Sequence, residues 1–173
     1  MSAETIISTM IRARGAFDMG DHSICDDFCY FSADVQTGRY VHLAHGVTIL
    51  GGGQRCTIGD FTAIGPGVRI VCASDDYDGG IAGPRIPTRF KRRPARGDVR
   101  IGRHCIIGAN SVILPGTVIP DGVAIGALSL VRPEDSLETD TLYAGCPLRR
   151  LRRRDPAASL EEAFLRDHSA DRT

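Results

Sequence analysis

The chain has 173 residues, and its 21 basic residues (Lys and Arg) equal its 21 acidic residues (Asp and Glu) in number. This balance gives no case for a nucleic-acid partner or an acidic membrane surface, and no apolar run of about 18 residues predicts a membrane span. The 20 glycines, nine prolines and 6% aromatic residues predict a single domain (1–173) with a narrow interior of aliphatic and small side chains.

The first predicted element is a short helix over residues 4–12. Ile6, Ile7, Met10 and Ile11 would share one face of this helix. The acidic Glu4 and the short apolar stretch do not match a secretory signal peptide. We expect the helix to cover the open end of the repeat structure that follows.

A six-residue repeat fills residues 13–136 and is most regular near its end. Aliphatic residues occupy every sixth position there, at Ile101, Ile107, Ile113, Ile119, Ile125 and Val131. A second position, four residues later in each unit, is small: Cys105, Ser111, Thr117, Val123 and Ser129. Even offsets return to the same face of a strand, whereas this spacing would scatter around a helix. Because glycine and proline recur between these positions, the strands must be short and joined by turns.

Three six-residue units would close one triangular coil. The same frame continues upstream, regularly at Ile58, Ile64 and Ile70, and more loosely at Met19, Cys25, Phe31, Thr37, Leu43 and Ile49. The sequence therefore predicts an all-β solenoid, a parallel β-helix of about five coils stacked about 4.8 Å apart. The general crossover preference predicts a right-handed path for such a chain.

The repeat is interrupted twice. The segment LGGGQRC lengthens the step between Ile49 and Ile58, and a long excursion over residues 74–100 separates Ile70 from Ile101. Counting every third unit places both interruptions at the same corner, one coil apart. The excursion is rich in basic residues: Arg85, Arg89, Lys91, Arg92, Arg93, Arg96 and Arg100. We expect a functional site at this corner, with an extended loop that either holds phosphate groups or is simply solvated.

The six cysteines show neither a CxxC pair nor a zinc-ligand spacing. The full set is Cys25, Cys29, Cys56, Cys72, Cys105 and Cys146, and several of these fall on inward positions of the repeat. Buried thiols of this kind predict a cytoplasmic protein with reduced cysteines and no metal site.

The last predicted element is a C-terminal extension over residues 149–168. It begins with clustered arginines: Arg149, Arg150, Arg152, Arg153 and Arg154. Asp155 and Pro156 then predict the start of a helix that offers Leu160, Phe164 and Leu165 for packing. The arginine cluster fits either a phosphate group or a solubilising collar.

The units IGRHCI, IGANSV, ILPGTV, IPDGVA and IGALSL, closed by YAGCPLRRL, resemble the hexapeptide-repeat acyltransferases that use acetyl-CoA. YVHLAHGVTILGGG, followed by IVCASDDYDGG, is similar to the sugar acetyltransferases of bacterial polysaccharide and O-antigen synthesis. The resemblance covers roughly residues 15–153. It implies a left-handed β-helix, against the general preference, and a homotrimer with each active site in a cleft between neighbouring solenoids.

The same resemblance implies where acetyl-CoA would lie. Ala109 in IGAN and Ala127 in IGAL match backbone positions that touch the pantetheine arm. Their separation of three repeat units would stack them on one face, as an extended ligand requires. Arg132, Arg149 and Arg152 match positions that engage the CoA phosphates, a role that suits guanidinium groups.

The catalytic residues depart from the family pattern. The position of the catalytic histidine in galactoside-type members holds Asp75 here, and the nearby asparagine position holds Ala44. We therefore favour His42 or His45 as the general base, oriented by Asp75 or Asp76 of a neighbouring subunit. The loop would also supply substrate contacts through Asp76, Tyr77 and Arg89.

The leading hypothesis is thus acetyl transfer to a hydroxyl or amine of a sugar or nucleotide-linked sugar. The sequence leaves oxygen and nitrogen acceptors open. One alternative is the zinc carbonic anhydrase built on the same β-helix, which requires three histidine ligands; His42 and His45 lie only three residues apart. A non-catalytic β-helical scaffold is the other alternative.

Overall fold

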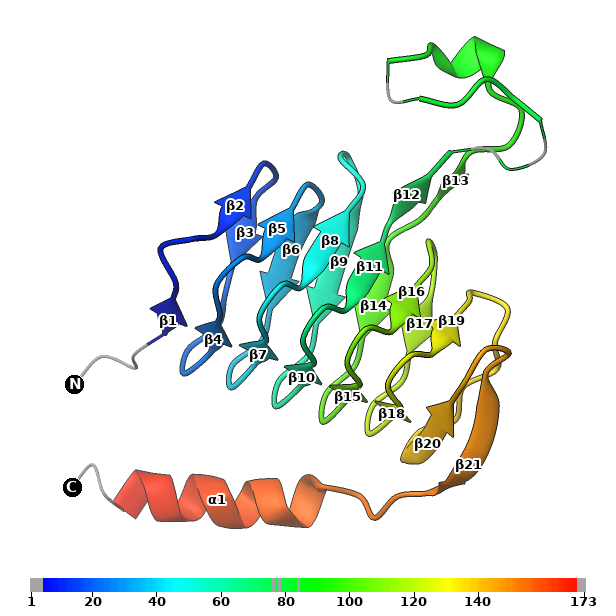
Figure 1. Cartoon of the computed structure of the whole chain (residues 1–173). Helices are drawn as coiled ribbons and strands as arrows, with labels where there is room; N and C mark the ends of the chain where they lie inside the picture. The colour runs from blue at the N-terminus through cyan, green and yellow to red at the C-terminus, as the bar shows by residue number, and fades with distance from the viewer. Residues whose placement is uncertain (1–4, 76, 78, 84, 171–173) are drawn as a thin grey trace.

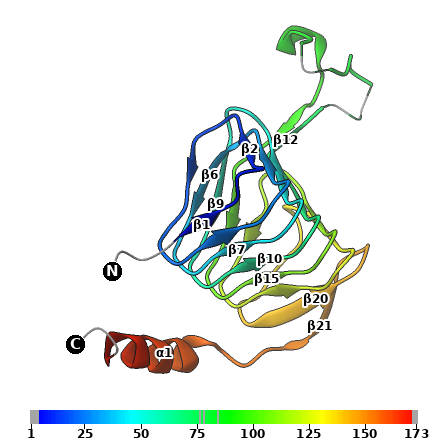
Figure 2. The same cartoon turned by 60° about the vertical axis from the view of Figure 1, so that its left-hand side comes forward.

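The computed structural model describes residues 5–75, 77, 79–83 and 85–170, without the side chains of residues 168–170. The chain forms a left-handed parallel β-helix with three faces, a projecting hairpin loop and one C-terminal helix (Figures 1 and 2). Face A carries β1 (Ile6–Ile7), β4 (Ile24–Cys25), β7 (His42–Leu43), β10 (Ala63–Ile64), β15 (Ile106–Ile107), β18 (Ala124–Ile125) and β20 (Thr141–Ala144).

The other two faces continue each coil. Face B carries β2 (Arg12–Ala13), β5 (Tyr30–Phe31), β8 (Thr48–Leu50), β11 (Arg69–Val71), β16 (Val112–Ile113) and β19 (Leu130–Val131). Face C carries β3 (Phe17–Asp18), β6 (Asp34–Thr37), β9 (Arg55–Ile58), β14 (Val99–Ile101) and β17 (Val118–Ile119). All pairings within these three sets of strands are parallel, so the backbone hydrogen bonds join one coil to the next.

The core is the column of side chains that the six-residue repeat points inward. Ile107 pairs with Ile125 on face A, and Phe31, Ile49 and Ile70 stack in register on face B. All of these residues are buried, and the small positions also point inward, including the polar Ser111 and Thr117. The predicted repeat frame is therefore confirmed at the level of individual side chains, including Thr37, a polar residue in an inward position.

The predicted N-terminal helix is wrong. Residues 6–7 and 12–13 are strands, and Ile7 pairs with Cys25 while Ala13 pairs with Phe31. The repeat frame reaches back to these two positions, so backbone pairing with the next coil outweighs the local helical spacing of the isoleucines. The solenoid consequently begins before residue 13, and face A extends to seven parallel strands, more than a count of about five coils suggests.

The long excursion leaves the solenoid at the corner between faces B and C. It starts and ends in an antiparallel hairpin of β12 (Ala73–Ser74) and β13 (Ala95–Arg96), and its far end holds a short 3-10 helix, η1 (Thr88–Phe90). Figure 1 shows the loop standing well clear of the coils. The extended, proline-rich character predicted for this segment agrees with the structure apart from that single helical turn.

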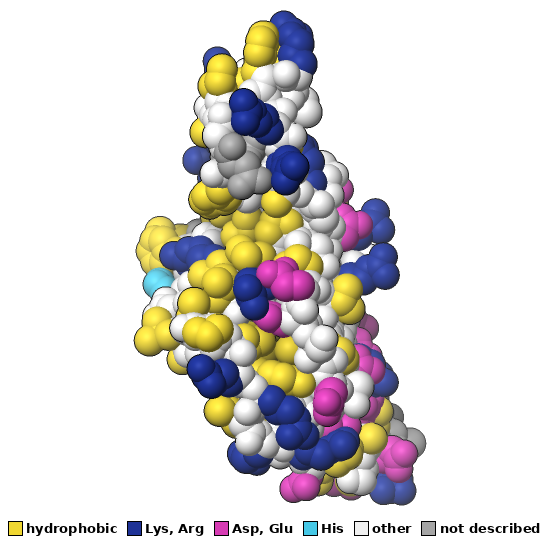
Figure 3. Space-filling model, turned by 90° about the vertical axis from the view of Figure 1, so that its right-hand side faces the viewer, with side chains coloured by type: hydrophobic (Ala, Val, Ile, Leu, Met, Phe, Trp, Pro, Cys, Tyr) yellow, Lys and Arg dark blue, Asp and Glu magenta, His cyan; other side chains and the backbone are white. Residues whose placement is uncertain are grey.

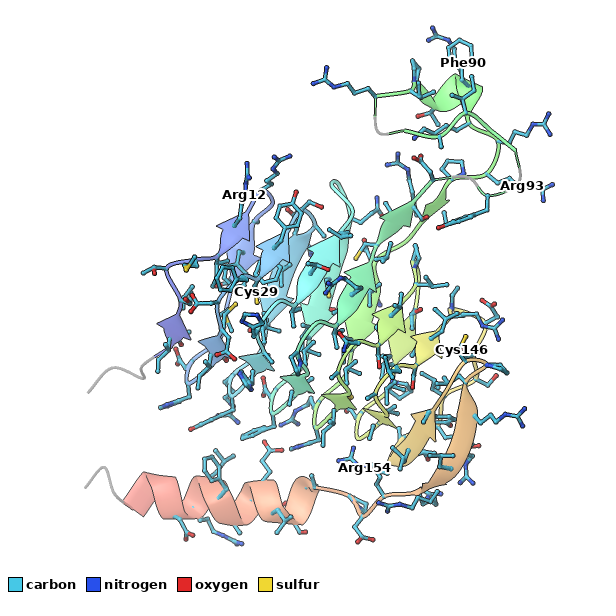
Figure 4. All side chains as sticks on the ribbon, viewed as in Figure 1. Arg12, Cys29, Phe90, Arg93, Cys146 and Arg154 are labelled. Carbon is cyan, nitrogen blue, oxygen red and sulfur yellow. The ribbon has the colours of Figure 1, made fainter. Side chains whose placement is uncertain are left out.

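The C-terminal extension returns along the solenoid. Strand β21 (Arg149–Arg153) pairs antiparallel with β20, and helix α1 (Ala158–Ala170) follows. Arg154 lies between the two elements (Figure 4). Its guanidinium donates hydrogen bonds to the carbonyl oxygens of His104 and Gly122, which holds this connection against the solenoid. The helix then runs back toward the N-terminal coils (Figure 2).

Four aromatic rings stack along the corner between faces C and A, one from each successive coil. His22, Tyr40, Phe61 and His104 have neighbouring ring centroids 4.7, 4.8 and 5.3 Å apart and nearly parallel planes. Helix α1 covers this aromatic stack with Phe164, which meets the Tyr40 ring edge-on at 5.3 Å. This packing explains why the apolar face of α1 is held at this corner.

Glu161 fastens the same helix electrostatically. Its carboxylate accepts a hydrogen bond from Arg103 at 2.6 Å and lies 2.7 Å from His104 Nε2, and its side chain is only 12% exposed. We expect Glu161→Gln to lower the free energy of unfolding by about 1–2 kcal/mol, since the arginine half of the pair is partly solvated. Urea denaturation at fixed protein concentration measures this. Glu162→Gln, which changes an exposed residue of the same helix, should have almost no effect, and equal losses in both variants would contradict the assigned role.

Candidate active site

The two interruptions of the repeat lie side by side at the corner between faces B and C, as predicted. Cys72 N–H donates to Leu50 O at 2.6 Å, and Gly97 N–H donates to Cys72 O at 3.0 Å. The turn between β8 and β9 is held in turn by Ser32, whose hydroxyl accepts the Gly51 N–H at 3.1 Å. These bonds fix the base of the loop against the glycine-rich turn one coil below it.

A recess of about 390 Å³ opens between this turn and the loop base. We call it the loop recess; its lining residues are Gly52, Ala73, Ser74, Asp75, Lys91 and Arg96. Two of the six are basic and one is acidic, so the recess combines positive charge with a hydroxyl group. These are groups that bind an anionic or strongly polar ligand.

Asp75 is the best-anchored side chain of the loop recess. Its carboxylate pairs with Lys91, whose side chain is only 6% exposed, and it accepts the Gly83 N–H at 2.7 Å. The hydrogen bond from Lys91, followed by that from Gly83, lowers the pKa of Asp75 below its ordinary value. Asp75 therefore joins the two arms of the loop, and its charge is already occupied within the chain.

The other predicted loop residues lie farther out. Tyr77 is 93% exposed, and Arg89 places its guanidinium 4.7 Å from the ring centroid of Phe90. Figure 4 shows Phe90 at the far end of the loop. Asp76 lies outside the described residues. Neither Tyr77 nor Arg89 lines the loop recess.

The two candidate histidines lie elsewhere on the same chain. His42 points outward from face A, and its Nε2 is 3.0 Å from Asp26 Oδ2. His45 follows in the turn to face B, exposed, with its ring edge-on to Phe28 at 5.3 Å. Because β7 belongs to face A and the loop leaves the corner between faces B and C, one chain does not bring either histidine to Asp75 (Figure 1).

The predicted alanine stack is present. Ala109 and Ala127 occupy equivalent turns between faces A and B, and Leu128 N–H donates to Ala109 O at 2.9 Å. The two turns approach closely because the residue before Ala109 is glycine: a Cβ on Gly108 would lie 2.4 Å from Ala127 N. The backbone of these two turns therefore forms a closely packed strip that crosses successive coils.

The three candidate phosphate-binding arginines differ in how they are engaged. Arg132 donates to Asp135 at 3.0 Å and lies 3.3 Å from Glu134, and the Asp135 hydrogen bond raises the pKa of Arg132. Arg149 and Arg152, on the exposed strand β21, form no ion pair with a carboxylate within the described part of the chain. Figure 3 shows the end of the molecule that carries β21, with basic side chains along its lower edge and on the loop above.

No family model matches the chain, but its sequence is similar to those of named acyltransferases. The chain is 34% identical over 151 residues to the dTDP-4-amino-4,6-dideoxy-D-glucose acyltransferase of Escherichia coli, which covers 84% of this chain and 77% of the relative. It is 32% identical over 136 residues to the lipopolysaccharide biosynthesis O-acetyl transferase WbbJ of Escherichia coli K12, covering 77% of the chain and 64% of the relative.

Solved structures give the same result. AntD, an N-acyltransferase from Bacillus cereus in complex with dTDP and 3-hydroxybutyryl-CoA, superimposes with a TM-score of 0.89 and 34% identity, covering 95% of this chain and 88% of AntD. A variant of AntD in which a serine is replaced by cysteine, in complex with dTDP-4-amino-4,6-dideoxyglucose and coenzyme A, gives a TM-score of 0.87. The chain belongs to the hexapeptide-repeat sugar acyltransferases. The resemblance inferred from the sequence motifs is confirmed, and so is the left-handed coil that it implied.

In this hexapeptide-repeat sugar acyltransferase, the repeat pattern predicted where the loop recess lies, but it did not identify several of the residues that form it. Lys91 is one of many loop cations in the sequence, and nothing in its spacing marks it as the partner of Asp75. Gly52 was visible only as part of a glycine-rich turn. Asp26 could have been found, because it lies on the outward side of the coil just below His42.

The described residues lack the features that other functional classes would require. They contain no helix that is long and apolar enough to cross a bilayer. They also contain no group of three or more histidine, cysteine or carboxylate side chains arranged to hold a metal ion. Since the identified relatives are acyltransferases, the carbonic anhydrase and scaffold alternatives are not favoured.

Proposed function

We propose that the protein transfers a short acyl group, acetyl being the simplest, from acyl-CoA to the amine of a sugar carried on a nucleoside diphosphate. The observation that carries this proposal is the similarity to AntD over 95% of the chain, because AntD is an N-acyltransferase that binds dTDP and an acyl-CoA. The amine nitrogen bonds to the thioester carbonyl carbon and the C–S bond breaks. The amine proton passes to a base and from the base to the departing thiolate, which leaves an amide and free CoA thiol.

The chemistry of the loop recess favours nitrogen over oxygen as the acceptor atom. A hydroxyl needs a strong base because its pKa is very high, whereas an amine reacts once it is neutral. Among the described residues that line the recess, the ionisable side chains are Asp75, Lys91 and Arg96, and Asp75 is held in its pair with Lys91. Within one chain the recess therefore offers no free base for a sugar hydroxyl, whereas an imidazole from a second copy, a weak base, would suffice for a neutral amine.

A homotrimer would complete this site. On face A, the outward side chains form an almost continuous apolar row, in which Ile24 and Ile106 are 40% and 48% exposed and only His42 is ionisable. Apolar surface of this kind supports association with a second copy of the chain. A neighbouring copy would bring His42 or His45 toward the loop recess, where Asp76, or Asp75 if it exchanged Lys91 for the imidazole, would orient the ring. Tyr77 and Arg89 would contact the acceptor.

The donor would lie against the C-terminal coils. We assign the backbone strip at Ala109 and Ala127 to the pantetheine arm, and Arg132, Arg149 and Arg152 to the CoA phosphates. Arg149 and Arg152 suit this role best, because neither has a carboxylate partner among the described residues, whereas Arg132 would have to exchange Asp135 for a phosphate. An acyl-CoA donor and five buried free thiols support a cytoplasmic location, although the sixth cysteine, Cys146, is exposed instead of buried.

A direct assay tests the function. Purified protein is mixed with acetyl-CoA and, in parallel reactions, with dTDP-4-amino-4,6-dideoxyglucose or with its counterpart bearing a hydroxyl at the same carbon. We expect thiol release and an amide product with the amine only. Thiol release that is equal for the hydroxyl sugar would overturn the assignment of nitrogen as the acceptor. No thiol release with either sugar, for any short acyl-CoA, would overturn the proposed function.

The pH dependence of the reaction tests whether Asp75 is a general base or only holds the loop in place. Its folded-state pKa is depressed below the ordinary value of 3.8, so its pairing is fully present at neutral pH and is lost only as the pH falls through that lower pKa. We therefore expect kcat/KM for the acceptor to rise with pH above about 5 as the amine loses its proton, without an inflection from Asp75. Asp75→Asn should lower the rate but leave the inflection of the amine unchanged. A second inflection at acidic pH in the parent protein that is absent from Asp75→Asn would identify Asp75 as the base.

A further inference from the structure

The glycine-rich turn between β8 and β9 contains one glycine that the fold does not need. Gly51 has φ +127°, and a Cβ there would lie 2.6 Å from Ala73 N. Gly53 has φ +82°, a backbone conformation that L-residues rarely adopt. Gly52 has neither constraint, because its φ is ordinary and a Cβ would meet only Ser32 O at 3.6 Å, a normal contact.

Other glycines of the solenoid differ from Gly52 because they have no room for a side chain. Nine further glycines also have an ordinary φ, and in each of them a Cβ would approach a neighbouring atom to 2.8 Å or less: Gly15, Gly20, Gly38, Gly59, Gly65, Gly97, Gly102, Gly108 and Gly126. Stacking of the coils therefore explains the missing side chain at those positions. It does not explain Gly52.

Gly52 lines the loop recess, opposite the side chains that the loop contributes. Ser74, Lys91 and Arg96 lie on the other sides of the same recess. The Gly52 N–H donates no hydrogen bond to another described residue, whereas the N–H groups of Gly51 and Gln54 in the same turn are both bonded. A glycine with space for a side chain and an available N–H is typical of a position where a ligand approaches the backbone.

We propose that Gly52 is a specificity-determining residue at which the acceptor sugar nucleotide approaches the backbone of this turn. This inference rests on the function proposed above, since the acceptor is its ligand. The absence of a side chain at Gly52 keeps the recess open, and any side chain there would fill space that the acceptor occupies. Ser74 and Arg96 offer polar contacts to the same ligand from the loop side.

Two substitutions in the same turn test the proposal, because they should have opposite effects. Gly52→Ala restricts the unfolded chain without strain in the folded one, so its melting temperature should equal or slightly exceed that of the parent protein. Its KM for dTDP-4-amino-4,6-dideoxyglucose should rise about tenfold, while the KM for acetyl-CoA is unchanged. Gly53→Ala places the new methyl group at a positive φ in open space, outside the recess, so its melting temperature should fall while both KM values are retained.

The possible outcomes are distinguishable. If the parent protein acylates no amino sugar, the proposed function fails before Gly52 is tested. If the parent is active and Gly52→Ala leaves the acceptor KM unchanged, or raises the KM for acetyl-CoA instead, the inference about Gly52 is wrong while the proposed function stands. A lower melting temperature in Gly52→Ala would indicate a structural role and would also overturn it. Gly52→Val extends the series, and its acceptor KM should exceed that of Gly52→Ala.

Discussion

Replacing Lys91 by methionine is expected to reduce kcat/KM for the acceptor about 100-fold. Lys91 is almost completely buried at the base of the loop, and its ammonium group is the main partner of the Asp75 carboxylate. Methionine preserves most of the buried length but leaves Asp75 with only the Gly83 N–H. The two arms of the loop then lose the ion pair that sets their separation. The side chains that line the loop recess should shift, and the acceptor would no longer be held in the orientation that the reaction needs.

Steady-state kinetics with both substrates checks this expectation. The effect should fall on the acceptor and not on the KM for acetyl-CoA, because the donor is assigned to the alanine strip and to strand β21. Lys91→Arg keeps the positive charge and should recover part of the lost activity, which a role in bulk folding alone would not explain. A methionine variant with parental activity would show that the pair between Asp75 and Lys91 does not organise the site.

Replacing Ile49 by alanine is expected to lower the free energy of unfolding by about 2–5 kcal/mol, the range measured for isoleucine truncations in close-packed cores. Ile49 is fully buried between Phe31 in the coil below and Ile70 in the coil above. The backbone pairing on both sides prevents those coils from closing around the missing atoms, so a cavity should persist. For a chain of this length, the loss corresponds to a fall in melting temperature of about 10 °C.

The matched control lies next to it on the same strand. Thr48 points outward, and its hydroxyl oxygen is buried without a hydrogen-bond partner among the described residues. Thr48→Val removes that unpaired oxygen at almost constant volume, so it should leave stability unchanged or raise it slightly. Thermal unfolding of both variants at one protein concentration is the measurement. A loss for Ile49→Ala within experimental error of Thr48→Val would contradict the inward and outward assignment.

The repeat made the solenoid predictable from sequence because each coil is determined locally. Side chains such as Ile107 and Ser111 must face inward if the chain is extended, and stacking at 18-residue steps then fixes the strand partners wherever no interruption intervenes. The corner of the candidate site followed from the same count, since both interruptions are measured in repeat units. The N-terminal residues were misjudged because a helical spacing of isoleucines was weighed without the repeat frame that also runs through Ile7 and Ala13.

The side-chain pairs of the candidate site could not be read from the sequence. The partner of Asp75 is decided by how a loop of irregular backbone folds back on itself, and several loop cations compete for that role in sequence terms. Likewise, His42 pairs with Asp26 within one chain because two coils place them on the same face, whereas from the sequence we considered only Asp75 or Asp76 of a neighbouring subunit as its partner. Contacts that depend on loop conformation or on a second copy of the chain lie beyond what periodicity determines.

The position of helix α1 changes how this solenoid should lose its structure. A stack of coils with contacts only between neighbours behaves as a one-dimensional array, in which an end can fray one unit at a time. Here the C-terminal helix touches Tyr40, Phe61 and His104, so it links coils that are not adjacent in the stack. Fraying of the last coil would then release contacts several coils away. This coupling favours all-or-none unfolding of the middle of the solenoid and leaves the N-terminal coil as the part free to fray independently.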